Sequence, residues 1–325
     1  MKKRIPVFTI ALLSFVVLIV FINSVSEKGT GDDYFHEAFQ KKYSIFSLPV
    51  PDSLNFAGEL VPLDYFDVRE SLDQELLVNT YWQSQTLLFI KRANRYFPAI
   101  EKILHEHDIP EDFKYLVLAE SDLKNAVSPS GAVGIWQLLK GTARDYGLEV
   151  NAEVDERYHF EKSTEAACEY LKDAHDLFGS WTMAAASYNM GRRGLIRQVN
   201  RQKENGYFDL LLNSETGRYV YRILAIKLIL EDPNKYGFYV RDEDLYHPIP
   251  TMEVKVDTAV ADFADFAKEH SINYKILKYF NPWLRDSFLT NKKGKEYTIK
   301  IPKEGYRSHE KIIDYAEIDS TNIKD

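Results

Sequence analysis

The sequence has little of several residue types that would indicate particular functions. It contains one cysteine, Cys168, in 325 residues, which excludes an intramolecular disulfide framework and a zinc site built from several cysteines. Its formal net charge is −8, so it lacks the excess of lysine and arginine that neutralises nucleic-acid phosphates. Its histidines show no metal-ligand spacing. We therefore predict no metal, no cofactor and no nucleic-acid partner.

Charged residues are also missing from one stretch near the start of the chain. Residues 5–22 form an apolar run of eighteen residues, preceded by the basic sequence MKKR. This pattern predicts export, and the run is just long enough to span a bilayer. Small residues before Glu27 leave cleavage open, whereas no cysteine follows the run, so a lipoprotein anchor is not expected. We predict a signal peptide or membrane anchor over 1–23 and a periplasmic location.

The pattern then changes from loop to helix. Residues 24–35 are polar and contain glycine, which predicts a linker. Within 36–250, apolar residues recur at threes and fours over 67–107 and again over 135–232, and no long alternating strand interrupts them. This region should be almost entirely α-helical, with Pro98 separating two of its helices.

The last part of the chain has a different character. In 251–303, the segments TMEVKV and KEYTIKIP alternate like strands and enclose two short helical patterns, which predicts a β-α-α-β unit. Residues 304–325 form a charged tail. The predicted fold class is therefore mainly α, followed by a small β-α-α-β module.

One glutamate lies where an acid catalyst would be expected. In IPEDFKYLVLAES, Pro110 suits the first helical position, and Phe113, Leu116 and Val117 mark a buried face. Glu120 follows one step later on that face. A carboxyl group in apolar surroundings has a raised pKa and can hold a proton near neutral pH, as a general acid must. On helical phase alone, a glutamate that turns out into water remains the alternative.

Four motifs occur in order from Glu120 onward: ES, then SPSGAVGIWQLLKGTARDYGL, AAASYNMG and ETGRYVYRILA. Together they resemble the catalytic domain of soluble lytic transglycosylases, of lysozyme-like fold, over a core of about 90–240. They are similar to those of the membrane-bound murein transglycosylase D type. The resemblance implies cleavage of the MurNAc–GlcNAc bond of peptidoglycan without water, which leaves 1,6-anhydroMurNAc ends.

The resemblance also implies roles for individual residues. Glu120 would be the catalytic acid and base. The ETGRYV motif has one residue more than usual, so Tyr221 is an alternative to Tyr219, and Trp136 is equally compatible with a place in the core. The residues expected to bind substrate are Ser121, Gly134, Trp136, Gln137, Tyr188, Asn189 and Tyr219.

A second catalytic carboxylate is not evident from the sequence. Asp122 falls on a different helix face from Glu120, and Asp145 lies in a segment expected to face solvent. In the mechanism that the resemblance implies, Glu120 acts alone, and the 2-acetamido and 6-hydroxyl groups of the sugar supply the remaining chemistry. The alternatives are a hydrolytic muramidase and a catalytically dead protein that binds peptidoglycan.

The predicted β-α-α-β unit, 251–303, resembles a LysM module, which binds glycans that contain N-acetylglucosamine. Asp257-Thr258 and the segment ILKYFNPW match the module, although the glycine usual before Asp-Thr is absent. The basic segment 192–203 either contacts carboxylates of peptide stems or is a solvated helix face. The expected partners are peptidoglycan strands and, through residues 1–23 if they are not cleaved, the membrane.

Overall fold

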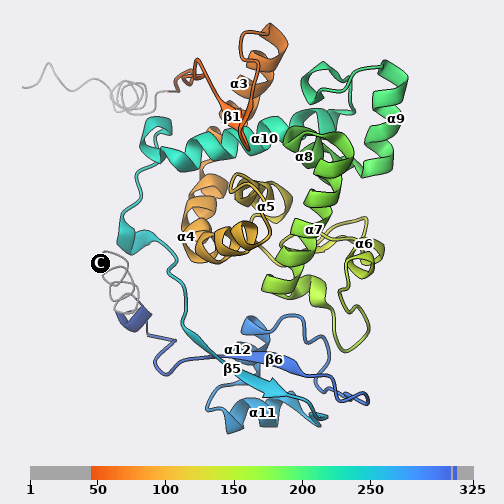
Figure 1. Ribbon diagram of the computed structural model, residues 1–325. Coiled ribbons are helices and arrows are strands. Elements are labelled where there is room, and N and C mark those ends of the chain that lie inside the picture. Colours follow the sequence, from red (N-terminus) through yellow and green to blue (C-terminus); the bar gives the residue numbers. More distant parts are fainter. Residues whose placement is uncertain (1–44, 309, 313–325) are drawn as a thin grey trace, which may run out of the picture. The chain divides into compact units, whose positions relative to one another are not determined.

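The computed structural model describes residues 45–308 and 310–312. The expected anchor, the linker and most of the charged tail lie outside these residues. The chain divides into two units after Ser47, and every element named below lies in the second (Figure 1). The α-helices are α3 (Phe66–Tyr81), α4 (Gln83–Glu106), α5 (Phe113–Ser121), α6 (Lys140–Asp145), α7 (Phe160–Phe178), α8 (Trp181–Met190), α9 (Arg192–Gln202), α10 (Ser214–Glu231), α11 (Phe263–Glu269) and α12 (Tyr274–Phe280).

Strands are short among the described residues and form three antiparallel pairs. The prediction of a mainly α fold with a small β-containing part near the C-terminus is confirmed. None of the described helices combines the length and the apolar character of a membrane span. The paired strands are β1 (Asn55–Phe56) with β2 (Glu59–Leu60), β3 (Ala126–Val127) with β4 (Val133–Gly134), and β5 (Thr251–Val256) with β6 (Tyr297–Pro302). Single 3₁₀ turns are η1 (Glu156–Tyr158), η2 (Tyr207–Asp209), η3 (Pro233–Tyr236) and η4 (Asp242–Asp244).

The break between α3 and α4 falls at Trp82, not at Pro98 as predicted. Trp82 has φ −87° and ψ 57°, which lies outside the helical region. Pro98 lies within α4 on its exposed side, where water can reach the carbonyl that loses its intrahelical donor. Ile100, Ile103 and Leu104 follow it and are buried, so packing against the core keeps the helix continuous.

Helix α5 lies between α4 and α10 in the helical part (Figure 1). It begins at Phe113, so the prediction that Pro110 opens the helix is wrong. The N–H of Phe113 bonds the carbonyl of Pro110 at 3.1 Å, in a turn that precedes the helix. The ring of Phe113 then packs edge-on against Phe56 and Trp181, with centroids 5.2 and 5.4 Å away. These contacts hold α5 in the core up to its last turn, which carries Glu120.

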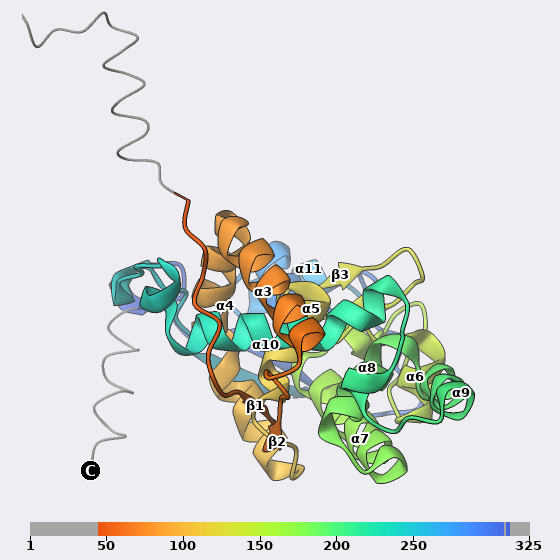
Figure 2. The ribbon, with the colours of Figure 1, turned by 90° about the horizontal axis from the view of Figure 1, so that it is seen from above.

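The β1–β2 hairpin ties together three of the helices that carry the sequence motifs. The Glu59 carboxylate accepts hydrogen bonds from the backbone N–H and the hydroxyl of Thr182 at 2.9 and 2.6 Å, at the N-terminus of α8. Asp112, just before α5, accepts from the N–H of Ala57 and from Lys227 of α10, both at 2.7 Å. The hairpin therefore links the ends of α5, α8 and α10. Seen from above, α3 lies beside α10 on the same side of the molecule (Figure 2).

The β-α-α-β unit is present as β5, α11, α12 and β6 (Figure 1). Its two strands pair over six residues, from Thr251 opposite Pro302 to Val256 opposite Tyr297. Its hydrophobic core does not end at its own boundary, because Val133 and Val154 of the helical part belong to the same cluster of buried residues.

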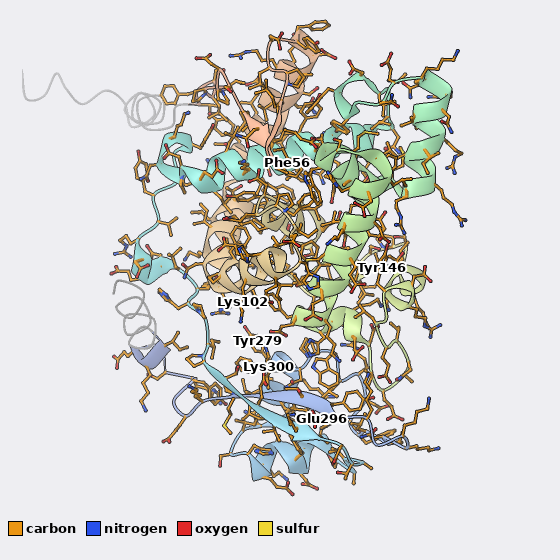
Figure 3. The ribbon with its side chains drawn as sticks, in the orientation of Figure 1. Phe56, Lys102, Tyr146, Tyr279, Glu296 and Lys300 are labelled. Atoms are coloured by element: carbon orange, nitrogen blue, oxygen red, sulfur yellow. The ribbon has the colours of Figure 1, made fainter. Side chains whose placement is uncertain are left out.

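Polar contacts reinforce this shared core. The N–H of Asp155 bonds the carbonyl of Trp283 at 2.9 Å. Arg95 of α4 donates to the Tyr279 hydroxyl at 3.1 Å, and Lys300 of β6 pairs with a carboxylate at the start of α7. Tyr279 and Lys300 are labelled in Figure 3 on the side of the unit that faces α4. The unit is thus fused to the helical part along several elements.

Candidate active site

A cleft of about 440 Å³ opens where the last turn of α5 meets α8, α10 and the loop after β3. Most of the side chains that the sequence analysis selected reach it. Its lining includes Glu120, Gln137, Tyr188, Asn189, Glu215, Tyr219 and Arg222.

Glu120 is half-buried and lines this cleft, so it turns away from bulk solvent as its helical phase predicts. Its carboxylate accepts a hydrogen bond from the Tyr219 hydroxyl. Burial raises the pKa of Glu120 to about 7, despite the lowering effects of the Tyr219 hydrogen bond and of the Arg222 charge. Glu215, a like charge in the same cleft, raises it further. The group therefore changes protonation near neutral pH.

Tyr219 is the tyrosine that meets Glu120, despite the extra residue in its motif. It is 2% exposed, and burial raises its pKa well above the usual value, so it remains a hydrogen-bond donor. Tyr221, the alternative, points elsewhere and packs against Tyr207 and Phe208 with centroids 5.8 and 5.9 Å away. The geometry excludes the alternative because residues two apart on a helix face different sides.

Tyr188 and Asn189, at the end of α8, line the opposite part of the cleft. The Tyr188 hydroxyl donates to the backbone carbonyl of Trp136 at 2.7 Å. The Asn189 carbonyl oxygen accepts from the Thr216 hydroxyl at 2.7 Å, and its amide nitrogen faces Glu215 at 3.4 Å. Both side chains are held in place by groups outside the helix that carries them.

Gly134 and Gln137 shape the loop that forms one wall of the cleft. Gly134 has φ +84°, and a Cβ there would lie 2.0 Å from the carbonyl oxygen of Arg157, so no larger residue fits. The Gln137 amide nitrogen donates to the carbonyls of Ala126 and Gly134 at 3.1 and 2.7 Å, which leaves its carbonyl oxygen for a ligand. Helical structure does not resume at Ile135, as the sequence suggested, but at Lys140.

Arg157 supports this loop from behind. It is 8% exposed, and its guanidinium donates to the carbonyls of Gly131 and Leu138 at 3.1 and 3.3 Å. Asp155 holds it with two contacts of 2.9 and 2.7 Å. The backbone N–H of Asp155 also bonds the carbonyl of Trp283, so the residues that support the cleft wall contact the β-α-α-β unit directly.

Three residues expected to bind substrate lie outside the cleft lining: Gly134, which acts through the loop described above, Trp136 and Ser121. The Trp136 side chain is fully buried and its indole N–H donates to the Thr164 hydroxyl at 2.8 Å. Ser121 is also buried, and its hydroxyl donates to the carbonyl of Ile135 at 2.6 Å. In this structure Trp136 is a core residue, and Ser121 joins the end of α5 to the cleft loop.

Sequence reasoning missed Glu215 and Arg222. Both lie on α10 with Tyr219, at spacings of four and three residues, so the face of the helix that presents Tyr219 also presents them. That spacing was the available signal. Glu215 is a second carboxylate in the cleft, whereas Asp145 is exposed elsewhere. Among the described residues, no group of three or more His, Cys, Asp or Glu side chains is arranged to hold a metal ion.

Comparison with known families agrees with this arrangement. Residues 98–210 match the transglycosylase SLT domain, and residues 252–305 match the soluble lytic transglycosylase C-terminal LysM-like domain. The chain contains an SLT transglycosylase domain followed by a LysM-like domain. The SLT match contains Glu120, Gln137, Tyr188 and Asn189, and the LysM-like match covers the β-α-α-β unit.

Curated relatives extend the similarity beyond the two domains. The chain is 27% identical over 266 residues to the membrane-bound lytic murein transglycosylase D of Escherichia coli strain K12, and equally to that of E. coli O6:H1 strain CFT073. The matches cover 79% of this chain and 57% of each relative. The chain is homologous to these proteins but spans little more than half of their length.

Proposed function

We propose that this protein is a lytic transglycosylase that cleaves the MurNAc–GlcNAc bond of peptidoglycan, with Glu120 as its sole general acid and base. The observation that carries the proposal is the half-buried Glu120 in the lining of the cleft, with a pKa of about 7 and a neutral hydrogen-bond donor, Tyr219. An acid that must give and then retake a proton works best when its pKa is close to the working pH.

The reaction has two steps. Glu120 first donates its proton to the glycosidic oxygen, and the bond from that oxygen to C1 of MurNAc breaks as positive charge develops on the sugar. The acetamido oxygen at C2 stabilises this charge. Glu120, now a carboxylate, takes the proton of the 6-hydroxyl group of MurNAc. The oxygen of that hydroxyl forms the new bond to C1. The products are a free GlcNAc hydroxyl and a 1,6-anhydroMurNAc end, and no water is consumed.

The other residues of the cleft would bind and orient the sugar. Tyr219 holds the Glu120 carboxyl, and burial keeps the Tyr219 phenol protonated. Gln137 and Asn189 offer amide groups to hydroxyl or acetamido groups. Gly134 lets the loop that carries Gln137 approach Arg157.

Hydrolysis is the alternative that one observation favours. A hydrolytic muramidase needs a second carboxylate to activate water or to attack C1, and Glu215 lies in the same cleft. Mass spectrometry of muropeptides after digestion of purified peptidoglycan separates the two. We expect products lighter by one water than reducing-end muropeptides. Reducing ends would establish hydrolysis, and uncleaved material would indicate a binding protein.

We further propose that the protein works on peptidoglycan in the periplasm, exported by residues 1–23, with its helical region over 36–250 and a glycan-binding LysM-like region over 251–303. The apolar run at 5–22 and the similarity to membrane-bound transglycosylases support this location. Cell fractionation with N-terminal sequencing tests it. A mature start near Glu27 would refute a retained anchor, and recovery from the cytosol would refute export.

A further inference from the structure

One side of the cleft is built by a single face of α10. Glu215, Tyr219 and Arg222 are spaced by four and three residues, and all three line the cleft. Tyr219, in the middle, bonds Glu120. The helix therefore presents an anion on one side of the acid and a cation on the other.

A buried carboxylate lies near Arg222. Glu75 of α3 is 1% exposed, and one of its oxygens pairs with Arg218 at 2.5 Å. Its other oxygen, Oε2, lies 3.9 Å from Nε of Arg222 and has no hydrogen-bond partner within the described part of the chain. Arg218 thus satisfies one oxygen at close range, whereas Arg222 is only loosely tethered to the other.

This tether leaves most of the Arg222 guanidinium free. The contact with Glu75 involves Nε, and the residues that the structure describes include no other ion-pair partner of Arg222. Its side chain is 33% exposed. The two terminal nitrogens of a guanidinium form a planar fork that matches a carboxylate with two hydrogen bonds.

The charges of the cleft restrict what Arg222 can bind. Glu215 repels an anion at its own end, so a carboxylate in the cleft would lie at the Arg222 end. The basic segment 192–203 does not contribute to the lining, and its Arg192 is paired with Asp173 at 3.1 Å. Among the described residues that line the cleft, Arg222 is the side chain that carries a permanent positive charge.

We propose that Arg222 binds a carboxylate of the peptide stem on the muramic acid residue, so that the enzyme prefers strands whose stems are ionised. This inference rests on the proposed function for the identity of the substrate. Glu75 is then a positioning residue, whose charge attracts Nε and leaves the terminal nitrogens available for a ligand. Arg222 also lowers the pKa of Glu120, so binding is measured apart from the proton transfers.

The test compares binding of two forms of one ligand. Soluble glycan fragments with intact stems are used as they are, or after carbodiimide and ammonia have converted the stem carboxylates to amides. Binding is measured by calorimetry with Glu120→Gln protein, so that no cleavage occurs. We expect the acid form to bind about tenfold more tightly than the amide form, as for a charge-assisted bidentate contact. Adding Arg222→Gln should remove this preference, and Arg222→Lys should retain part of it.

Arg218→Gln is the matched control, because Arg218 shares the helix and the Glu75 partner but does not line the cleft. It should keep the preference for the acid form. A preference that survives Arg222→Gln, or that is lost equally in Arg218→Gln, would overturn the proposal. Failure of the proposed function appears separately, as absence of muropeptide products from the protein with Glu120 intact.

Discussion

Two glutamates, Glu120 and Glu156, show how differently the cleft and the junction with the LysM-like region use carboxylates that are shielded from solvent. Glu120 has a neutral partner, Tyr219, and burial raises its pKa to about 7. Glu156 is 2% exposed, and although burial alone would raise its pKa, Lys162 and the N–H of Glu149 bond it at 2.5 and 2.7 Å and lower the pKa. Partners, rather than burial, decide which carboxylate can act as an acid.

The two regions differ in the same way as the two residues. In the cleft, side chains such as Gln137 and Arg222 contact the protein through some of their polar atoms and leave other polar atoms available to a ligand. At the junction the charges are paired across the boundary: Lys295 of the LysM-like region contacts Glu149 at 2.6 Å and Glu156 at 3.3 Å. The first arrangement is suited to a ligand and the second to stability.

The largest expected effect comes from replacing the proposed acid, Glu120. Glu120→Gln keeps the size of the side chain but removes the proton that, in the proposed mechanism, reaches the leaving oxygen. We expect cleavage of purified peptidoglycan to fall by about 1,000-fold or more, within the range for loss of general acid catalysis. Glu156→Gln is the matched control and should reduce stability instead, with the acid still present. Activity of Glu120→Gln near the wild-type level would refute the role of Glu120.

Deleting residues 251–325 should be the next most damaging change. If these residues formed an independently tethered glycan-binding module, their deletion would lower the affinity for intact sacculi and leave the helical region unaffected. Instead, deletion exposes Val133 and Val154 and removes the Trp283 carbonyl that holds Asp155. We expect the melting temperature to fall by about 10 °C, as for a loss of a few kcal/mol. Scanning calorimetry measures it; an unchanged melting temperature and unchanged turnover of short glycans would show that the region is independent.

The pH dependence of stability should distinguish the two glutamates. The folded-state pKa of Glu120 is about 7 against 4.5 in the unfolded chain, so its contribution to stability falls as pH rises from 4.5 to 7. Glu156 has a lowered pKa, so its contribution is present above 4.5 and is lost as pH falls through the folded value.

Glu120→Gln should therefore stabilise the protein increasingly between pH 4.5 and 7, by on the order of 3 kcal/mol at the upper end. Urea unfolding of both proteins across this pH range measures the difference in the free energy of unfolding. A difference that stays constant with pH would mean that Glu120 titrates normally.

The smallest effect should follow from Tyr219→Phe, which removes one hydrogen bond from the acid. Because that bond lowers the pKa of Glu120, the variant should lose activity at a higher pH than the wild type. We also expect the rate at the optimum to fall about tenfold, since the carboxyl is less well oriented. The dependence of the rate on pH measures both the shift and the loss of rate at the optimum. Tyr221→Phe, two residues along the same helix, should leave the profile in place; an equal shift in both variants would contradict the specific role of Tyr219.

Much of the cleft could be anticipated from local sequence. The spacing of apolar residues in α5 turns Glu120 inward, and the motifs supplied Gln137, Tyr188, Asn189 and Tyr219, all of which line one cleft. The catalytic and binding roles of these residues remain predictions. Local pattern was less informative for Trp136, because the same aromatic ring suits a core and a sugar-binding surface. It was misleading at Pro98, where packing of α4 outweighs the missing hydrogen bond.

By itself, the sequence determined the helical phase of each segment and the residue types available to the cleft, because both depend on neighbours within a turn or two. Only the tertiary structure decided their partners. Tyr219 meets Glu120 across 99 positions of the chain, and Arg218 meets Glu75 across 143. The fusion of the LysM-like region to the cleft wall is likewise a matter of distant contacts. Such contacts set the pKa of the Glu120 carboxyl and the partner of Arg218, and they cannot be read from a periodicity of three or four residues.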